Sequence, residues 1–264
     1  MMSQLMLVLG VAPILAPTLG GTVLAIASWR WIFWILACYA LVCCAVVYVW
    51  LPETLPPERR IALRPAQQLA RYGAILRDRV FLTHAAMSGC ASFAFFSYLG
   101  GSSPVFIRGF QLLPLQFALI FGLCSIGLIG STQINARLVP RLGLSRILRI
   151  VARTHLCATL TLAVIAFSGV HVLPLVILPV FVAVSCMGYL NPNIVVGALT
   201  HQGHNAGSAS ALMGTGQFLL GAVGGLLVGI FTDGTPRGMA ALMLLGSIGL
   251  VTADLLRSRQ GQIA

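Results

Sequence analysis

Residues 9–21 read LGVAPILAPTLGG, an apolar run that contains two prolines and three glycines. Inside a helix in water, proline costs about 3 kcal/mol and glycine about 1 kcal/mol relative to alanine. A membrane helix tolerates both, because neighbouring helices and local backbone adjustments satisfy the freed polar groups. Small residues also let helix backbones approach closely. The stretch therefore predicts a kinked, closely packed helix inside a bilayer.

The composition of the whole chain also indicates a membrane protein. Of its 264 residues, 58% are hydrophobic and 8% are charged, whereas a soluble domain carries about 25% charged residues. The mean hydropathy is +0.97. Such a chain has too little polar surface to fold in water, and we expect an all-α polytopic protein in a lipid bilayer.

The net charge of +11 comes from arginines that lie mostly between apolar runs. That placement follows the positive-inside rule and disfavours a nucleic-acid partner.

All seven cysteines fall within apolar stretches, without a CxxC pair, and are interpreted as packing residues.

The hydrophobic pattern predicts eight membrane spans, since a spanning helix needs about 20 apolar residues. Their approximate ranges are 4–27, 31–51, 80–102, 115–135, 149–168, 172–193, 207–231 and 237–256. Most arginines between them fall on one side of the membrane if the spans alternate in direction: Arg59, Arg60, Arg64, Arg71, Arg77, Arg79, Arg137, Arg141, Arg146, Arg149, Arg257 and Arg259. The opposite side receives Arg30, Arg108 and Arg237. This asymmetry predicts that both termini and the 52–79 loop are cytoplasmic.

An internal repeat relates the first span to the seventh. Residues 10–21 read GVAPILAPTLGG and residues 214–225 read GTGQFLLGAVGG, so both begin with Gly and end with Gly-Gly. Parallel six-span repeats build one class of secondary transporter. The second half would begin near residue 79, so four further spans are expected before the first. The chain is then equivalent to helices 5–12 of a twelve-helix fold.

These residues resemble a known family. The string APTLGG at 16–21 is similar to the GPxxGG antiporter motif in the fifth helix of drug exporters of the major facilitator superfamily, with Ala16 where the motif usually has Gly. SWRWIF at 28–33 and PETLPPERR at 52–60 resemble the segments that follow it, and the likeness is greatest to the Bcr/CflA drug-resistance subfamily.

The resemblance implies a fold and a function. Residues 1–51 would be the last two helices of the N-terminal bundle, residues 52–79 the central cytoplasmic loop, and residues 80–264 the six-helix C-terminal bundle. The protein would export small amphipathic drugs in exchange for protons across the bacterial inner membrane, and would be neither an enzyme nor dependent on a cofactor. A non-transporting membrane subunit, or an inactive remnant of such a transporter, is the alternative.

Two motifs acquire roles through the same resemblance. Ala16, Pro17, Gly20 and Gly21 would seal the interface between the two halves against ion leakage; ordinary tight packing is the alternative. VPRLGLSR at 139–146 is similar to the family's cytoplasmic loop motif and keeps Arg141, Gly143 and Arg146. Pro140 replaces the usual acidic residue, which removes the acid that a charge relay in this loop would need.

A second set of residues forms a candidate substrate cavity, because drug pockets combine aromatic rings with a few polar groups. Its members are Phe96, Tyr98, Asn191, Asn193 and Gln217. Polar side chains in lipid are expensive and usually face the bundle interior. The alternatives are lipid-facing aromatic rings and purely structural hydrogen bonds. Gln133 and Asn135 lie near the cytoplasmic end and are expected to reach water.

The acidic residues, Glu53, Glu58, Asp78, Asp233 and Asp254, all lie away from the middle of a predicted span. A proton carrier normally needs an ionisable group inside the membrane, so we expect that group in the further spans. His84 and His155 are interpreted as packing residues. His201 and His204 lack a nearby third ligand, so no metal site is predicted.

Overall fold

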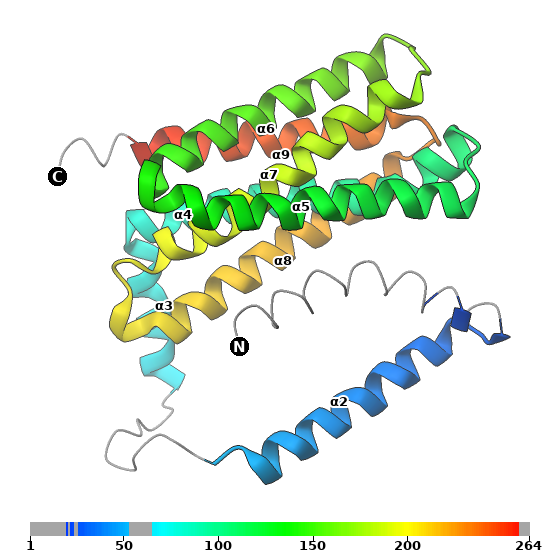
Figure 1. Ribbon diagram of the computed structural model, residues 1–264. Helices are drawn as coiled ribbons and strands as arrows, with labels where there is room; N and C mark the ends of the chain where they lie inside the picture. Colours follow the sequence, from blue (N-terminus) through cyan, green and yellow to red (C-terminus); the bar gives the residue numbers. More distant parts are fainter. Residues whose placement is uncertain (1–19, 21, 24–25, 53–64, 259–264) are drawn as a thin grey trace. The chain divides into compact units, whose positions relative to one another are not determined.

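The computed structural model describes residues 20, 22–23, 26–52 and 65–258 (Figure 1). The chain divides into two compact units, Met1–Gln68 and Leu69–Ala264. In the described residues every regular element is helical, and seven helices are long and apolar enough to cross a membrane. These seven confirm the last seven predicted spans. The first predicted span, 4–27, lies mostly outside the described residues.

The first unit contributes α2, Arg30–Trp50. None of its side chains is buried within the chain, although the helix is apolar throughout. Trp29 precedes it, with the Arg30 guanidinium 5.0 Å from the Trp29 ring centroid. A helix that is hydrophobic all round belongs inside a membrane or a large core, so the uncovered surface of α2 is suited to lipid or to other helices.

The second unit is a bundle of six long helices. A short helix, α3 (Pro65–Arg77), precedes them and begins within the first unit. The long helices are α4 (Arg79–Ser103), α5 (Pro114–Leu142), α6 (Leu144–Phe167), α7 (Leu173–Leu199), α8 (Ala206–Phe231) and α9 (Pro236–Ser258). Asp78 caps α4 by accepting a 2.9 Å hydrogen bond from the Val80 amide. A π-helical turn, η2 (Pro104–Gly109), extends α4, and a 3₁₀ turn, η3 (Gly203–Asn205), precedes α8.

Helix α4 forms the centre of the bundle and packs against α7, α8 and α9 (Figure 1). Helix α6 packs on α7 and α9, and α5 packs mainly on α7. Only 17% of the apolar stretch of α5 and 22% of that of α8 is buried inside the structure. In the span that begins with α4, the buried share is 61%. Helices α5 and α8 therefore present broad apolar faces that no described helix of the bundle covers.

The apolar core lies in two clusters along the bundle. We call the end where α5 meets α6 the Gly143 end and the end where α6 meets α7 the Gly169 end. Phe81, Leu148 and Ile194 are buried near the Gly143 end. Phe106 and Leu162 belong to the cluster nearer the Gly169 end. Both clusters draw side chains from helices far apart in sequence, which fixes the helices against one another.

Residues 136–148, which the predicted spans 115–135 and 149–168 leave as a loop, are helical except for Gly143. Helix α5 continues to Leu142 and α6 begins at Leu144, with Gly143 between them at φ +75°. Pro140 lies in the last turn of α5, and Gly143 adopts a conformation that other residues rarely tolerate. The loop prediction was wrong because a polar, basic sequence was interpreted as irregular when it continues both helices beyond the apolar region.

Candidate functional site

Phe96 and Gln217 lie together on the seam between α4 and α8. Ser88 Oγ of α4 donates a 3.2 Å hydrogen bond to Gln217 Oε1 of α8. The Phe96 ring meets Phe218 edge-on, with centroids 6.2 Å apart. Gly221 gives the Phe96 ring room, because a Cβ there would stand 2.8 Å from its Cδ2 atom. The seam thus carries the Gln217 amide and the Phe96–Phe218 ring pair beside the uncovered face of α8.

Asn193 lies elsewhere, in a buried amide pair between α7 and α5. Its Nδ2 donates to Asn135 Oδ1 at 2.7 Å and to the Tyr189 carbonyl at 2.8 Å. Both asparagines are less than 5% exposed. The expectation that Asn135 reaches water was therefore wrong, because its partner sits on a different helix and buries it. Asn191 is exposed on α7, away from this pair.

Tyr98 occupies a third position, inside the core. It is 2% exposed, and its ring stacks on Phe121 of α5 with centroids 6.3 Å apart. The five candidate cavity residues are thus distributed over several places in the bundle. Phe96 and Gln217 lie along one seam, and Phe95 links the Phe96 ring to the Tyr98 ring at centroid distances of 6.1 and 6.2 Å. A substrate contact by any of them stays a proposal.

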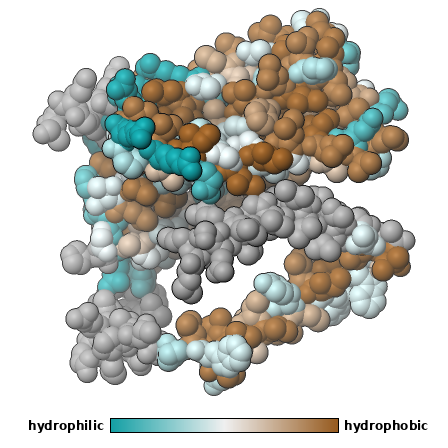
Figure 2. Space-filling view, viewed as in Figure 1, coloured by the Kyte–Doolittle hydropathy of each residue, from teal (hydrophilic) through white to brown (hydrophobic). Residues whose placement is uncertain are grey.

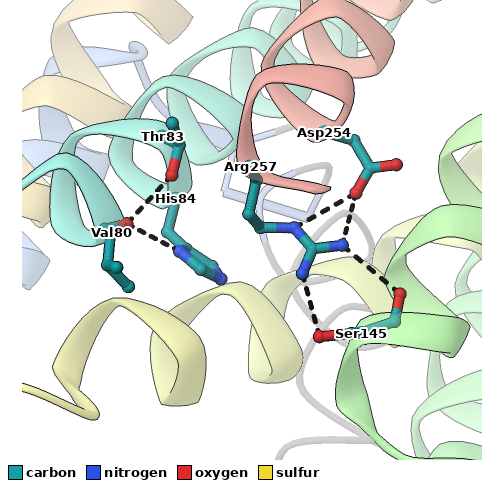
Figure 3. A network of polar contacts seen from close by, with 6 residues as sticks. All are labelled: Val80, Thr83, His84, Ser145, Asp254 and Arg257. Atoms are coloured by element: carbon teal, nitrogen blue, oxygen red, sulfur yellow. Dashed lines mark hydrogen bonds and ion pairs between the residues drawn. The ribbon is translucent and has the colours of Figure 1, made fainter. Parts of the chain in front are cut away.

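A buried ion pair lies at the Gly143 end (Figure 3). Arg257 Nε donates to Asp254 Oδ1 at 3.1 Å, and the side chains are 9% and 3% exposed. Arg257 also donates to Ser145 Oγ at 3.0 Å and to the Ser145 carbonyl at 3.3 Å. This network joins the end of α9 to the start of α6. Arg257 follows the last predicted span, 237–256, whereas in the structure α9 extends through it to Ser258.

The loop-motif residues surround this network without forming it. Arg141 is exposed in the last turn of α5, Gly143 makes the joint, and Arg146 is exposed in the first turn of α6. The polar partner that the motif region supplies is Ser145. Sequence reasoning missed Ser145, since a serine carries no signal of an arginine more than 100 positions away.

Two buried histidines complete the polar interior. His84 Nδ1 donates to the Val80 carbonyl at 2.7 Å, and its Nε2 atom has no hydrogen-bond partner among the described residues (Figure 3). The ring packs against Gly197 of α7. His155 Nδ1 of α6 lies 2.7 Å from Ser247 Oγ of α9, to which Thr159 Oγ1 donates at 2.8 Å. Both rings therefore help to join pairs of helices.

A cavity of about 480 Å³ opens at the Gly169 end, between η2 and the turn from α8 to α9. Its lining includes Arg108, His171, Asp233 and Thr235. The Thr235 hydroxyl and amide donate to Asp233 Oδ1 at 2.6 and 2.8 Å. These hydrogen bonds hold the pKa of Asp233 below its ordinary value.

The antiporter-motif residues are described only in part. Ala16, Pro17 and Gly21 lie outside the described residues, and Gly20 is helical. Within the described ranges, no three His, Cys, Asp or Glu side chains are grouped closely enough to hold a metal ion. The described acids are Asp78, Asp233 and Asp254, of which only Asp254 lies within a spanning helix.

Comparisons with known proteins agree on one family. The model of the Major Facilitator Superfamily matches residues 1–225. The uncharacterized MFS-type transporter YdgK of Bacillus subtilis is 31% identical to the chain over 98% of the chain and 65% of its own length. The bicyclomycin resistance protein homolog of Haemophilus influenzae is 26% identical over 86% of the chain and 57% of its own length.

The chain thus spans about two thirds of the first relative and less of the second. Structure and comparison lead to the same assignment. Seven helices in the described part are long and apolar enough to cross a membrane, and six of them form a bundle with two uncovered faces. The family model also matches most of the sequence. The chain is a multi-pass membrane protein that belongs to the Major Facilitator Superfamily, a family of transporters and not of enzymes.

Proposed function

We propose that this chain serves in the export of small amphipathic, drug-like molecules across the bacterial inner membrane in exchange for protons. The observation that carries the proposal is the APTLGG string at 16–21 within a chain of this family. The name of the bicyclomycin resistance protein homolog supports a drug as substrate. The substrate and the coupled ion are both parts of the proposal.

The uncovered faces of α5 and α8 supply the physical argument for a path. Alternating access needs a substrate site between two repeats that rock against each other. We propose that these faces border that path. Residues 1–51 would be the last two helices of the N-terminal bundle, residues 52–79 the central cytoplasmic loop and residues 80–264 the C-terminal bundle. Phe96 and Gln217 would then border the path from the α4–α8 seam.

The antiporter-motif residues Ala16, Pro17, Gly20 and Gly21 would close the contact between the halves, because small residues permit close helix packing. Proton exchange needs an ionisable group that is free to titrate. Asp254 does not meet that need, since it is committed to Arg257, and Asp78 and Asp233 lie outside the spanning helices. Coupling would therefore rest on a group other than the three described acids.

The test is export from cells that express the chain. Retention of ethidium, an amphipathic cation, is measured with and without a protonophore. We expect lower retention that the protonophore abolishes, and loss of export in G20L/G21L. The matched control is Gly73→Leu in α3, a short helix that precedes the spanning helices, because a Cβ at Gly73 meets no atom within 4 Å. Unchanged export in G20L/G21L would contradict the sealing role.

A second candidate is a non-transporting membrane subunit or an inactive remnant of a transporter. The chain spans 65% and 57% of the lengths of the two relatives, and whether it transports alone separates the two candidates. An inserted, folded chain that leaves ethidium retention unchanged would support this candidate and refute export by the chain alone.

A further inference from the structure

Three arginines form an exposed ridge on the first turns of α6. Arg146, Arg149 and Arg153 are all exposed. At 100° and 1.5 Å per residue, their side chains lie within an arc of about 60° and along about 10 Å of the helix. We call these three residues the α6 ridge. Arg146 ends the loop motif at 139–146, whereas Arg149 and Arg153 lie beyond that motif.

The α6 ridge has no anionic partner among the described residues. Asp254 is paired with Arg257, Asp78 accepts hydrogen bonds from Val80 and Gln202, and Asp233 lies at the opposite end of the bundle. Like charges three and four residues apart repel each other on a helix. Cations near a helix N-terminus are also opposed by the helix dipole. An external anion would relieve both effects.

The ridge runs directly into an exposed apolar stripe. Leu160, Val164 and Phe167 of α6 are 49%, 62% and 61% exposed and continue the same helix face. From Thr154 to Phe167 the helix rises only about 21 Å, less than the ~30 Å hydrocarbon core. Arg153 thus lies at or below headgroup depth, where a guanidinium must extend back toward the surface.

The position of α6 favours lipid as the neighbour of this face. Figure 1 shows α6 on one side of the bundle and α8 on the other. The uncovered apolar face of α8 thus lies away from α6. Figure 2 shows hydrophilic surface gathered largely at the Gly143 end and apolar surface over the middle of the bundle. Arg257 holds the start of α6 through Ser145, so the ridge is carried on a fixed helix.

We propose that the α6 ridge is a binding site for the phosphate group of an anionic phospholipid, whose acyl chains lie along the apolar stripe below it. Guanidinium groups bind phosphate oxygens through paired hydrogen bonds. Basic side chains at a membrane surface attract anionic lipids. The site would hold α6 at a fixed depth, and it is independent of any transported substrate.

The test is a lipid titration of the full chain in non-ionic detergent, followed by native mass spectrometry. The probes are phosphatidylglycerol and zwitterionic phosphatidylcholine. We expect R146Q/R149Q/R153Q to weaken binding of the first phosphatidylglycerol by tenfold or more, with no change for phosphatidylcholine. R146K/R149K/R153K should show a smaller loss than the Gln variant, because the charge is kept while the paired guanidinium hydrogen bonds are lost.

The matched control is R77Q/R79Q/R137Q, which removes three exposed arginines of the same end. It should change phosphatidylglycerol affinity less than twofold. Equal losses in the two Gln variants, or unchanged binding in the ridge variant, would overturn the proposal. Displacement of the lipid by equimolar glycerol phosphate would do so as well. If the triple variant fails to fold, R149Q and R153Q alone should each show a several-fold loss.

Discussion

Several buried polar side chains in this bundle form groups that link two helices. Asn135 pairs with Asn193 between α5 and α7, and Asp254 pairs with Arg257, which reaches Ser145 of α6. In a bilayer an unsatisfied polar group costs several kcal/mol, since no water is available to replace a lost partner. Such groups are therefore expected to act together, and removal of one partner should cost more than removal of both.

The Asp254–Arg257 pair allows a direct test of that expectation. We expect Asp254→Asn to lower the free energy of unfolding by about 3 kcal/mol, because it leaves the buried guanidinium without its counter-charge. Thermal or denaturant unfolding in detergent would measure the loss. The double variant D254L/R257M removes both charges and should lie closer to the native protein.

R141Q is the control for this experiment, since it removes an exposed arginine at the same end of the bundle. It should leave the unfolding midpoint nearly unchanged. A double variant less stable than D254N would contradict the idea that the two charges act as one unit.

Sequence reasoning found several of these polar residues but not their partners. Asn193 was identified because an amide in an apolar run is expensive, yet its partner Asn135 was assigned to water. Ser145 and Ser247 carry no such signal, because a serine in a helix can also bond its own backbone, as Ser247 does with the Met243 carbonyl. Their longer-range partners depend on how helices distant in sequence pack, which a single sequence does not encode locally.

At the scale of the helices, close contacts in the bundle are made through glycine. A Cβ at Gly224 of α8 would meet the Phe93 carbonyl oxygen of α4 at 2.5 Å, and one at Gly246 of α9 would meet the Cys90 carbonyl oxygen at 2.8 Å. Backbone atoms cannot move aside as a flexible side chain can. These glycines therefore set how near α8 and α9 approach α4, in agreement with the role of small residues in membrane helices.

The close approach at Gly224 predicts opposite effects for two similar substitutions on one helix. Gly224→Ala should destabilise the bundle by about 1–3 kcal/mol through overpacking. Gly229→Ala should be neutral or stabilising by up to about 1 kcal/mol, because a Cβ there meets no atom and alanine favours the helix. Unfolding midpoints of the two variants, measured in one detergent, would separate these outcomes. A loss of stability in Gly229→Ala equal to that in Gly224→Ala would refute the packing argument.

The sequence predicts where the helices lie better than it predicts where they end. The six spans of the bundle follow from runs of apolar residues, and each prediction overlaps one helix. The ends extend further, since α4 continues through a π-helical turn to Gly109 and α5 reaches Leu142. A hydropathy pattern detects the hydrocarbon core, whereas helices continue into the headgroup region until a residue such as Gly143 ends them.

The distribution of charge over the bundle bears on how the whole molecule lies in the membrane. Besides the α6 ridge, Arg77, Arg79, Arg137 and Arg141 are exposed at the Gly143 end, whereas Arg108 and Arg237 are exposed at the Gly169 end. Because cytoplasmic loops carry an excess of basic residues, this difference predicts that the Gly143 end and both termini face the cytoplasm. Six spans between residues 79 and 257 are consistent with that arrangement.

Cysteine labelling in whole cells would test this orientation. In a chain with its seven cysteines replaced by alanine, S168C lies at the end of α6 and T200C follows α7, and both positions are exposed. We expect a membrane-impermeant maleimide to label S168C in intact cells and T200C only after permeabilisation. The reverse pattern would place the arginine-rich end outside. In that case the positive-inside rule would not apply to this chain, and the prediction that the 52–79 loop is cytoplasmic would be wrong.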